Sequence, residues 1–530
     1  MSRLTIKQRP TKHSLLPRVS YDIKATPIVC QTTLTTMSLP LQDDTDLVLS
    51  KNSSPSCTVE SLPPELLLKI FIKNTELDDP SHNRLHTAHW SSQVSRLWRA
   101  LLLGSPSVWG RLLELTYYER AGDNWREEVL SRVGNALLWI TGSVTESIAP
   151  FLFSVLDKKW KRVQILEIAF RRSQSDDFQA EMWPFLCSEA LGLESISLEY
   201  FHGQPPSGTS SANLFNGIAP RLRNFRISPS FHFDVNAQWL STLCGLSLSC
   251  DTIPVVASIL KATPLLRCLK LSGDLVEDQD TTFMDHTVLD IPPLPYLERL
   301  EISGCHAYLI VLLESIHLPS RRQALHRLSI DSCRHAHNNP PPEVLERMRR
   351  AFTRWIQAYM DDFPPQYMHL FEHRVHNHDS VTIVDPRWTP NDGFQLMLGR
   401  GHPFISIFGA SSIFSAITQL RLRPGPQPDL WVPLYKAFHS VVELSIHGTW
   451  IKGILNVVNQ FSLFPSLRTL QCDRIAMAPF PRMLDFLEHR ASIGLPLSVL
   501  YLTSADIGRL SDAHRDRLDK ITGLSLRETL

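Results

Sequence analysis

The chain lacks the cysteine spacings that indicate a disulfide framework or a structural zinc site. Its nine cysteines are scattered over 530 residues, and no Cys-x-x-Cys pair occurs. No apolar run reaches the roughly 18 residues that a membrane span needs, and the strongest candidate, YLIVLLESI, is interrupted by Glu314. We therefore expect no membrane partner and a reducing location, in the cytoplasm or nucleus.

The chain also lacks an excess of charge of either sign. Lys and Arg together number 53, as do Asp and Glu, so the formal net charge is zero. This balance gives no general attraction to nucleic acid, and we expect no nucleic-acid partner. The first 24 residues are locally basic; we interpret residues 1–57 as a disordered tail and linker, with a targeting peptide or basic arm as the alternative.

Motifs that would announce catalysis are missing as well. The sequence has no Walker loop, dinucleotide-binding glycine fingerprint, nucleophile elbow or HExxH helix. We expect no catalytic residues, no cofactor and no metal, although an enzyme with catalytic groups far apart in the sequence remains an alternative. Cys333, His335 and His337, and the run HRVHNH, could supply zinc ligands. We interpret them as solvated loops because their surroundings are polar and rich in proline.

The most informative segment lies at 58–112. Ser61 is placed to cap a helix whose first turn holds Pro63 and Pro64. The apolar residues of this helix follow at helical spacing: Leu66, Leu67, Ile70 and Phe71. A second apolar stripe, which Gly104 and Pro106 would end, predicts one further helix: Val94, Leu97, Trp98, Leu101 and Leu102. Two helices of this length bury only a small core, so we expect some of these residues to remain available for another chain or for the rest of the protein.

With its LPPELL-IF opening and its V-x-x-x-W then P-x-x-W close, this segment resembles an F-box of the fungal, basidiomycete-type variety. Ser92 and Ser95 replace small cysteines often found in the second helix, and the connection from 73 to 90 is longer than a minimal F-box needs. The resemblance implies docking to a Skp-type adaptor and through it to a cullin. It places these residues at the adaptor: Leu62, Pro63, Leu66, Ile70, Val94, Trp98 and Trp109. The alternative is the first helical hairpin of a larger α domain.

Beyond this segment, the pattern apolar-x-x-apolar-x-apolar recurs. The hexads begin at 163, 193, 222, 243, 266, 297 and 325, and again at 417, 441, 467 and 497. Within the two blocks their starts lie 21 to 31 residues apart, near the leucine-rich repeat period. Four hexads are entered through Pro-x-Leu, and several follow a helical stretch, so each unit reads as a helix followed by a short strand.

The expected fold class is therefore α/β, with a helical F-box-like module (58–112), a helical connector (113–160) and a leucine-rich-repeat domain (161–530). This last part resembles an irregular, degenerate leucine-rich-repeat solenoid with a curved parallel sheet. The asparagine of regular repeats is missing, and Ser272, Ser303 or Asp331 is expected to follow the strand in its place. The period is lost near 331–416, where we expect an insertion with a helix and a buried strand at 380–384. An ordinary mixed α/β domain is the alternative.

The resemblance implies a non-catalytic substrate receptor of a Skp-cullin-F-box-type ubiquitin ligase. The F-box would bind the adaptor, and the repeats would bind a target protein through residues that the sequence does not identify. The alternative from another class is an interaction scaffold whose F-box-like hairpin only caps the repeats. In that arrangement, Leu66, Ile70 and Trp98 would pack internally.

Overall fold

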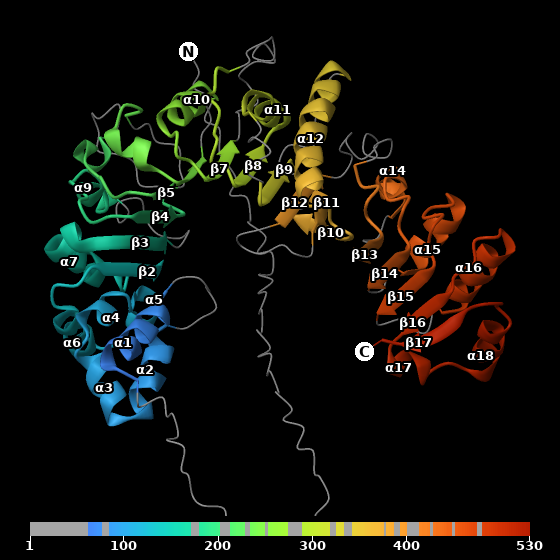
Figure 1. Ribbon diagram of the computed structural model, residues 1–530, viewed down its shortest axis with the longest axis horizontal. Coiled ribbons are helices and arrows are strands. Elements are labelled where there is room, and N and C mark those ends of the chain that lie inside the picture. Colours follow the sequence, from blue (N-terminus) through green and yellow to red (C-terminus); the bar gives the residue numbers. More distant parts are fainter. Residues whose placement is uncertain are drawn as a thin grey trace, which may run out of the picture. The chain divides into compact units, whose positions relative to one another are not determined.

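The computed structural model describes residues 62–76, 84–170, 180–201, 213–227, 234–249, 253–273, 289–317, 325–332, 342–375, 378–385, 393–399, 413–423, 428–447, 451–473 and 480–529. These residues lie in one structural unit, Leu62–Leu530 (Figure 1). The expected N-terminal tail and Ser61 fall outside the described residues.

Seventeen strands in the described ranges form one sheet. They are β1 (Leu113–Glu114), β2 (Leu138–Val144), β3 (Val163–Phe170), β4 (Ser195–Glu199), β5 (Asn224–Ile227), β6 (Gly245–Ser249), β7 (Cys268–Gly273), β8 (Arg299–Gly304), β9 (Arg327–Asp331), β10 (Tyr367–Val375), β11 (His378–Val384), β12 (Gly393–Gly399), β13 (Gln419–Arg423), β14 (Glu443–His447), β15 (Thr469–Asp473), β16 (Val499–Leu502) and β17 (Ser525–Glu528).

The α-helices begin with a helical module and then alternate with strands. They are α1 (Pro64–Lys73), α2 (Arg84–Val94), α3 (Arg96–Leu103), α4 (Pro106–Gly110), α5 (Leu115–Tyr118), α6 (Asp123–Val133), α7 (Ala149–Lys159), α9 (Trp183–Leu186), α10 (Ile253–Ala262), α11 (His306–Ser315), α12 (Pro342–Asp362), α14 (Val432–Lys436), α15 (Ile451–Gln460), α16 (Phe480–Ser492), α17 (Ser504–Ile507) and α18 (Asp512–Asp519). Short 3₁₀ turns lie at Trp160–Arg162, Leu214–Gly217, Gln238–Thr242 and Pro428–Trp431.

Neighbouring strands pair in parallel from β1 through β9, and again from β13 through β17. The expectation of a mixed α/β fold with a parallel sheet is confirmed at this level. Each of the eleven hexads supplies a strand, which begins at or within two residues of its first apolar position. The turn that precedes the strand holds Pro-x-Leu in units such as Pro264–Leu266.

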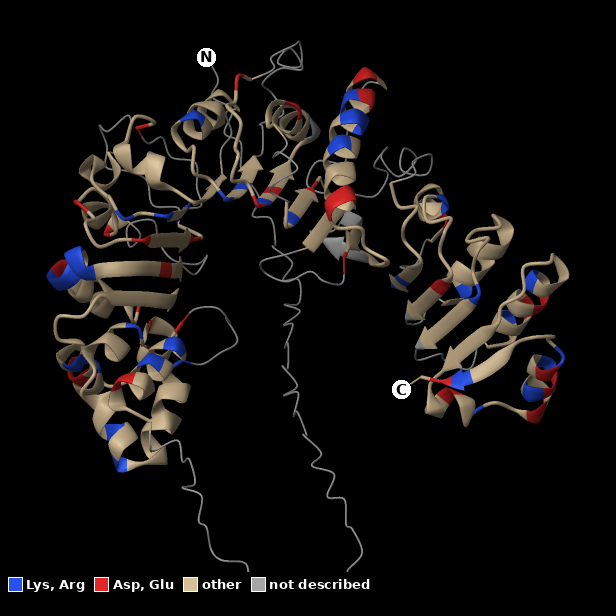
Figure 2. Cartoon of the chain, viewed as in Figure 1, with Lys and Arg blue, Asp and Glu red and all other residues tan. Residues whose placement is uncertain are grey.

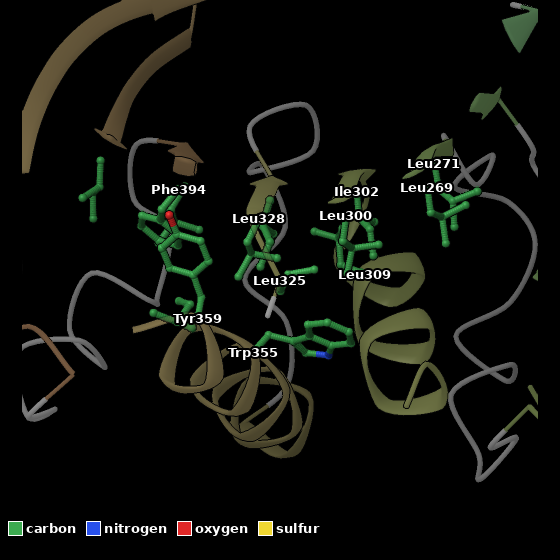
Figure 3. Packing of buried hydrophobic residues seen from close by; sticks show 14 of the residues in the cluster. Leu269, Leu271, Leu300, Ile302, Leu309, Leu325, Leu328, Trp355, Tyr359 and Phe394 are labelled. Carbon is green, nitrogen blue, oxygen red and sulfur yellow. The ribbon is translucent and has the colours of Figure 1, made fainter. Parts of the chain in front are cut away.

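Burial explains the hexad. In the unit at 266, Leu266, Leu269 and Leu271 are each at most 1% exposed, and the residues between them face away from the core. The first, fourth and sixth positions therefore pack toward the helices. Figure 3 shows this packing, with Leu269, Leu271, Leu300, Ile302 and Leu328 on the strands and Leu309, Trp355 and Tyr359 on the helices beneath. We call the opposite side of the sheet the open face.

The insertion between the two blocks of hexads keeps the sheet continuous. After α12, strand β10 runs parallel to β13, and β12 runs parallel to β9. Strand β11 lies between β10 and β12 and is antiparallel to both, which makes it the reversed strand among those described. It contains the strand expected at 380–384, and Ile383 is fully buried.

Three local expectations need correction. The stripe from Val94 to Leu102 is not one helix, because Ser95 ends α2 and starts α3, with its Oγ accepting a hydrogen bond from the Trp98 amide at 3.3 Å. The connector at 113–160 is not purely helical, since it contains β1 and β2. Ser272, Ser303 and Asp331 lie within β7, β8 and β9 rather than after them.

Candidate docking surface and groove

Helix α1 has a buried face and an exposed apolar face. Leu67 and Phe71 are at most 2% exposed and pack into the core, which anchors the helix. Leu66 and Ile70, one turn apart on another side, remain 44% and 42% exposed. The helix begins at Pro64, and Pro63 is its N-cap residue. Proline has no backbone N–H, but the first N–H groups of a helix have no partner within the helix, so proline is tolerated at both positions.

The neighbouring helices expose apolar side chains as well. Val94 at the end of α2 is 62% exposed, and Leu97 in the first turn of α3 is 39% exposed, whereas Leu102 of α3 is buried. Helix α3 contacts both α1 and α2 (Figure 1). We define the apolar docking surface as Leu66, Ile70, Val94 and Leu97.

The other residues expected at the adaptor differ in how far they are buried. Pro63 is exposed and Leu62 half-buried. Trp98 is half-buried, with its ring edge-on to Phe71 at a centroid distance of 5.0 Å. Trp109 is 8% exposed and donates from Nε1 to the carbonyl oxygen of Leu102 at 2.9 Å. Trp109 thus contributes to packing within the chain, and the apolar docking surface omits it.

Arg84 joins this helical module to the sheet. From α2 its guanidinium donates to the Arg111 carbonyl at 3.0 Å and to Thr141 Oγ1 of β2 at 2.5 Å. Glu114 of β1 lies 4.0 Å away. Burial lowers the pKa of Arg84, while the nearby carboxylates of Glu114 and Glu167 oppose this shift. Thr141 is in register with Glu167 on β3. The hydrogen bond from Arg84 to Thr141 therefore connects α2 to the open face of the sheet.

Replacing Arg84 with methionine should loosen this junction. Methionine keeps most of the packing volume but leaves the Arg111 carbonyl without its side-chain donor, at a cost of about 1–3 kcal/mol. We expect amide hydrogen exchange in α2 and β1 of the full chain to rise about tenfold or more. The matched control is Arg96→Met on the exposed side of α3. Equal exchange in both variants would contradict an anchoring role for Arg84.

A groove with a volume of about 890 Å³ lies on the open face over β2 to β8. Its central row follows the strand register: Glu167, Ser197, Arg226, Ser247, Lys270 and Glu301. Small side chains form the floor between the charged ones. Gly245 allows Asn224 to lie across it, because a Cβ there would come within 2.5 Å of Asn224 Oδ1.

Basic and acidic residues lie along the strands of the groove (Figure 2), and ion pairs join several of them. Arg226 binds Glu199 at 2.9 Å between β5 and β4. On the other side of the groove, Glu301 binds both Lys270 at 2.9 Å and Arg327 at 2.8 Å. One carboxylate thus compensates two cations there.

The lining of the groove includes one thiol, that of Cys268. Burial raises the pKa of the Cys268 thiol, which keeps it protonated and poorly nucleophilic. Within the described ranges, no group of three His, Cys, Asp or Glu residues is arranged to hold a metal ion. The candidate zinc ligands Cys333, His335, His337 and His376 lie outside those ranges, as do the side chains of His373 and His378. None of the helices described is long and apolar enough to cross a membrane.

Comparison with known proteins adds no assignment. No protein-family model matches the chain, and no curated protein matches it.

The groove residues escaped identification from the sequence. Each residue of the central row occupies the fifth position of its hexad, between two buried apolar residues. The same position in the second block supplies Arg421, Ser445, Gln471 and Tyr501, which are also in register. Aligning the hexads and reading their fifth positions down the chain would have identified both rows.

Proposed function

We propose that this chain is a non-catalytic substrate receptor of a Skp-cullin-F-box-type ubiquitin ligase. The helical module would bind a Skp-type adaptor and the sheet domain a target protein. The observation that carries the proposal is the apolar docking surface: Leu66 and Ile70 project outward although the same helix buries Leu67 and Phe71 in the core. A helix that served only internal packing would have no use for both apolar faces.

The receptor needs no chemistry of its own. Holding a target beside the ubiquitin-transfer machinery raises its effective concentration, and that alone accelerates transfer. A domain that joins the adaptor-binding module firmly to the target-binding sheet suits this task. The Arg84 contacts with Arg111 and Thr141 supply such a connection.

The second candidate is a scaffold in which the helical module only caps the sheet. Its support is the packing of the module against the first strands, where β1 pairs with β2 and Leu112, Leu113 and Leu115 are each 1% exposed. A pure cap leaves the exposure of Leu66, Ile70 and Val94 unexplained, so we favour the receptor.

Co-purification of the full chain with a Skp-type adaptor tests the proposal. We expect a stable complex that Ile70→Asp weakens by about 30-fold or more, because a carboxylate would be buried at the centre of an apolar interface. The matched control is Ile493→Asp, since Ile493 is 45% exposed at the far end of the chain and Ile70 is 42% exposed.

The two variants separate the candidates. Loss of binding in Ile70→Asp, with unchanged thermal unfolding and full binding by Ile493→Asp, supports the receptor. A parent chain that binds no adaptor leaves the scaffold as the better account.

A further inference from the structure

We infer that the groove over β2 to β8 binds an extended peptide segment that carries a basic residue near one end and an acidic residue near the other. The inference rests on the proposed function, in which the sheet domain captures a target, and it specifies the chemistry of that target. It starts from the uneven distribution of charge along the groove.

The end of the groove at β3 and β4 is acidic. Two carboxylates, Glu167 and Glu199, line this end. The central row supplies one cation beside them, Arg226, which forms an ion pair with Glu199 at 2.9 Å. Including the neighbours Arg84, which is buried, and Glu114, which is half-buried, leaves the charge balance negative, since they add one charge of each sign. Glu167 lies close to Arg84 and lines the groove, where its carboxylate accepts a hydrogen bond from Ser195 Oγ at 3.2 Å. A carboxylate held in this way can also accept a hydrogen bond from a cationic side chain of a ligand.

The end at β7 to β9 is basic. Lys270 and Arg299 line the groove, and Arg327 stands beside them in the next strand. Glu301 is the carboxylate of the central row at this end, and it already binds Lys270 and Arg327. Among the residues that line the groove on β7 and β8, two are cations and one is a carboxylate, and Lys270 keeps 49% of its side chain exposed. An acidic side chain can join this group without displacing Glu301.

The sheet itself constrains how a ligand binds. Strands β3 to β8 are paired on both sides, so no backbone edge is free within the groove and recognition depends on side chains. Ser197, Ser247 and Gly245 leave room between the charged ends. A strand of nucleic acid carries one sign of charge throughout and would be repelled at Glu167 and Glu199.

The spacing of the ends sets the spacing of the charges on the ligand. Four strand intervals separate Glu167 on β3 from Lys270 on β7, which is about 19 Å at roughly 4.8 Å per interval. An extended peptide advances roughly 3.3 Å per residue, so its two charged residues should lie about six residues apart.

Selection from a display library of random peptides, with the full chain as bait, tests the inference. We expect enrichment of sequences in which Lys or Arg lies about six residues from Asp or Glu, in one consistent order along the peptide. The double variant Glu167→Lys/Lys270→Glu reverses the polarity of the groove and should enrich the opposite order. The matched control, Glu443→Lys/Arg527→Glu, makes the same charge changes on β14 and β17 and should select the original order.

A filling variant tests the groove without altering any charge. Ser247→Trp places a large ring on the floor between Arg226 and Lys270, and we expect it to weaken a selected peptide by about tenfold or more. No enrichment, enrichment of apolar motifs, or an unchanged motif in the polarity-reversed variant would overturn the inference. Adaptor co-purification, measured on the same preparations, keeps the two proposals apart: a chain that selects the motif but binds no adaptor contradicts only the receptor function.

Discussion

Replacing Arg490 with alanine should destabilise the C-terminal part of the sheet domain by about 3 kcal/mol or more. Arg490 lies in α16 and is 1% exposed. Its guanidinium donates to the carbonyl oxygens of Leu463 (3.3 Å), Phe464 (3.2 Å) and Leu495 (3.2 Å). Alanine removes all three hydrogen bonds from a buried site, leaving carbonyls without these donors and a cavity where the side chain lay.

The bonds of Arg490 also hold an unusual turn. Ser462 and Phe464 have φ angles of 49° and 53°, a left-handed conformation that costs free energy for residues with a side chain. Two of the three bonds end on Leu463 and Phe464 and so hold this turn against α16. Burial lowers the pKa of Arg490, and the charge is compensated by backbone carbonyls and by the Phe486 ring, 5.9 Å from the guanidinium carbon.

Amide hydrogen exchange on the full chain is the suitable measurement, because domains built from stacked units need not unfold in one step. A loss of about 3 kcal/mol corresponds to roughly 100-fold faster exchange in α15 and α16. Arg482→Ala on the exposed side of the same helix is the control, and Arg490→Lys should give an intermediate effect because one ammonium cannot reach all three carbonyls. Unaltered exchange in Arg490→Ala would show that the turn is stable without the hydrogen bonds from Arg490.

Much of the sheet could be predicted from the sequence, because the hexad pattern follows from which residues of each unit are buried. Its first, fourth and sixth residues must all reach the core, and a short strand after a turn satisfies this requirement. Strand β2 was missed because LWITGSV has no hexad and lies in a segment that was expected to be helical. The reversal of β11 was also missed, since a buried apolar run reads the same in either direction.

The docking surface and the groove differ in how far they could be predicted. Leu66 and Ile70 were singled out, but helical spacing alone cannot say which apolar residues face outward, and Trp109 proved to be buried. The groove depends on register between strands that are distant in the chain. Glu167 and Lys270 look like ordinary exposed charges until the pairing of five strands brings them into one row.

Replacing Trp355 with alanine should cost about 3–5 kcal/mol at the junction between the two blocks of hexads. Trp355 of α12 is fully buried beneath β8 and β9, as Figure 3 shows, and donates from Nε1 to the Leu313 carbonyl of α11 at 2.9 Å. Arg354 donates to the same carbonyl and to that of Ile316. The last carbonyls of a helix have no partner within it, so α12 completes the hydrogen bonding of α11.

Two substitutions divide the effect of Trp355 into its parts. Trp355→Phe keeps most of the apolar burial and removes the hydrogen bond, so it should cost about 1–3 kcal/mol, whereas Trp355→Ala also leaves a cavity. Trp125→Ala is the matched control, since Trp125 is 42% exposed. We expect faster amide exchange in α11, α12 and β12, with little change in β14 to β16, because stacked units are stabilised mainly by their neighbours. Equal exchange in the Phe and Ala variants would mean that the hydrogen bond, and not the volume of the ring, holds α12 against α11.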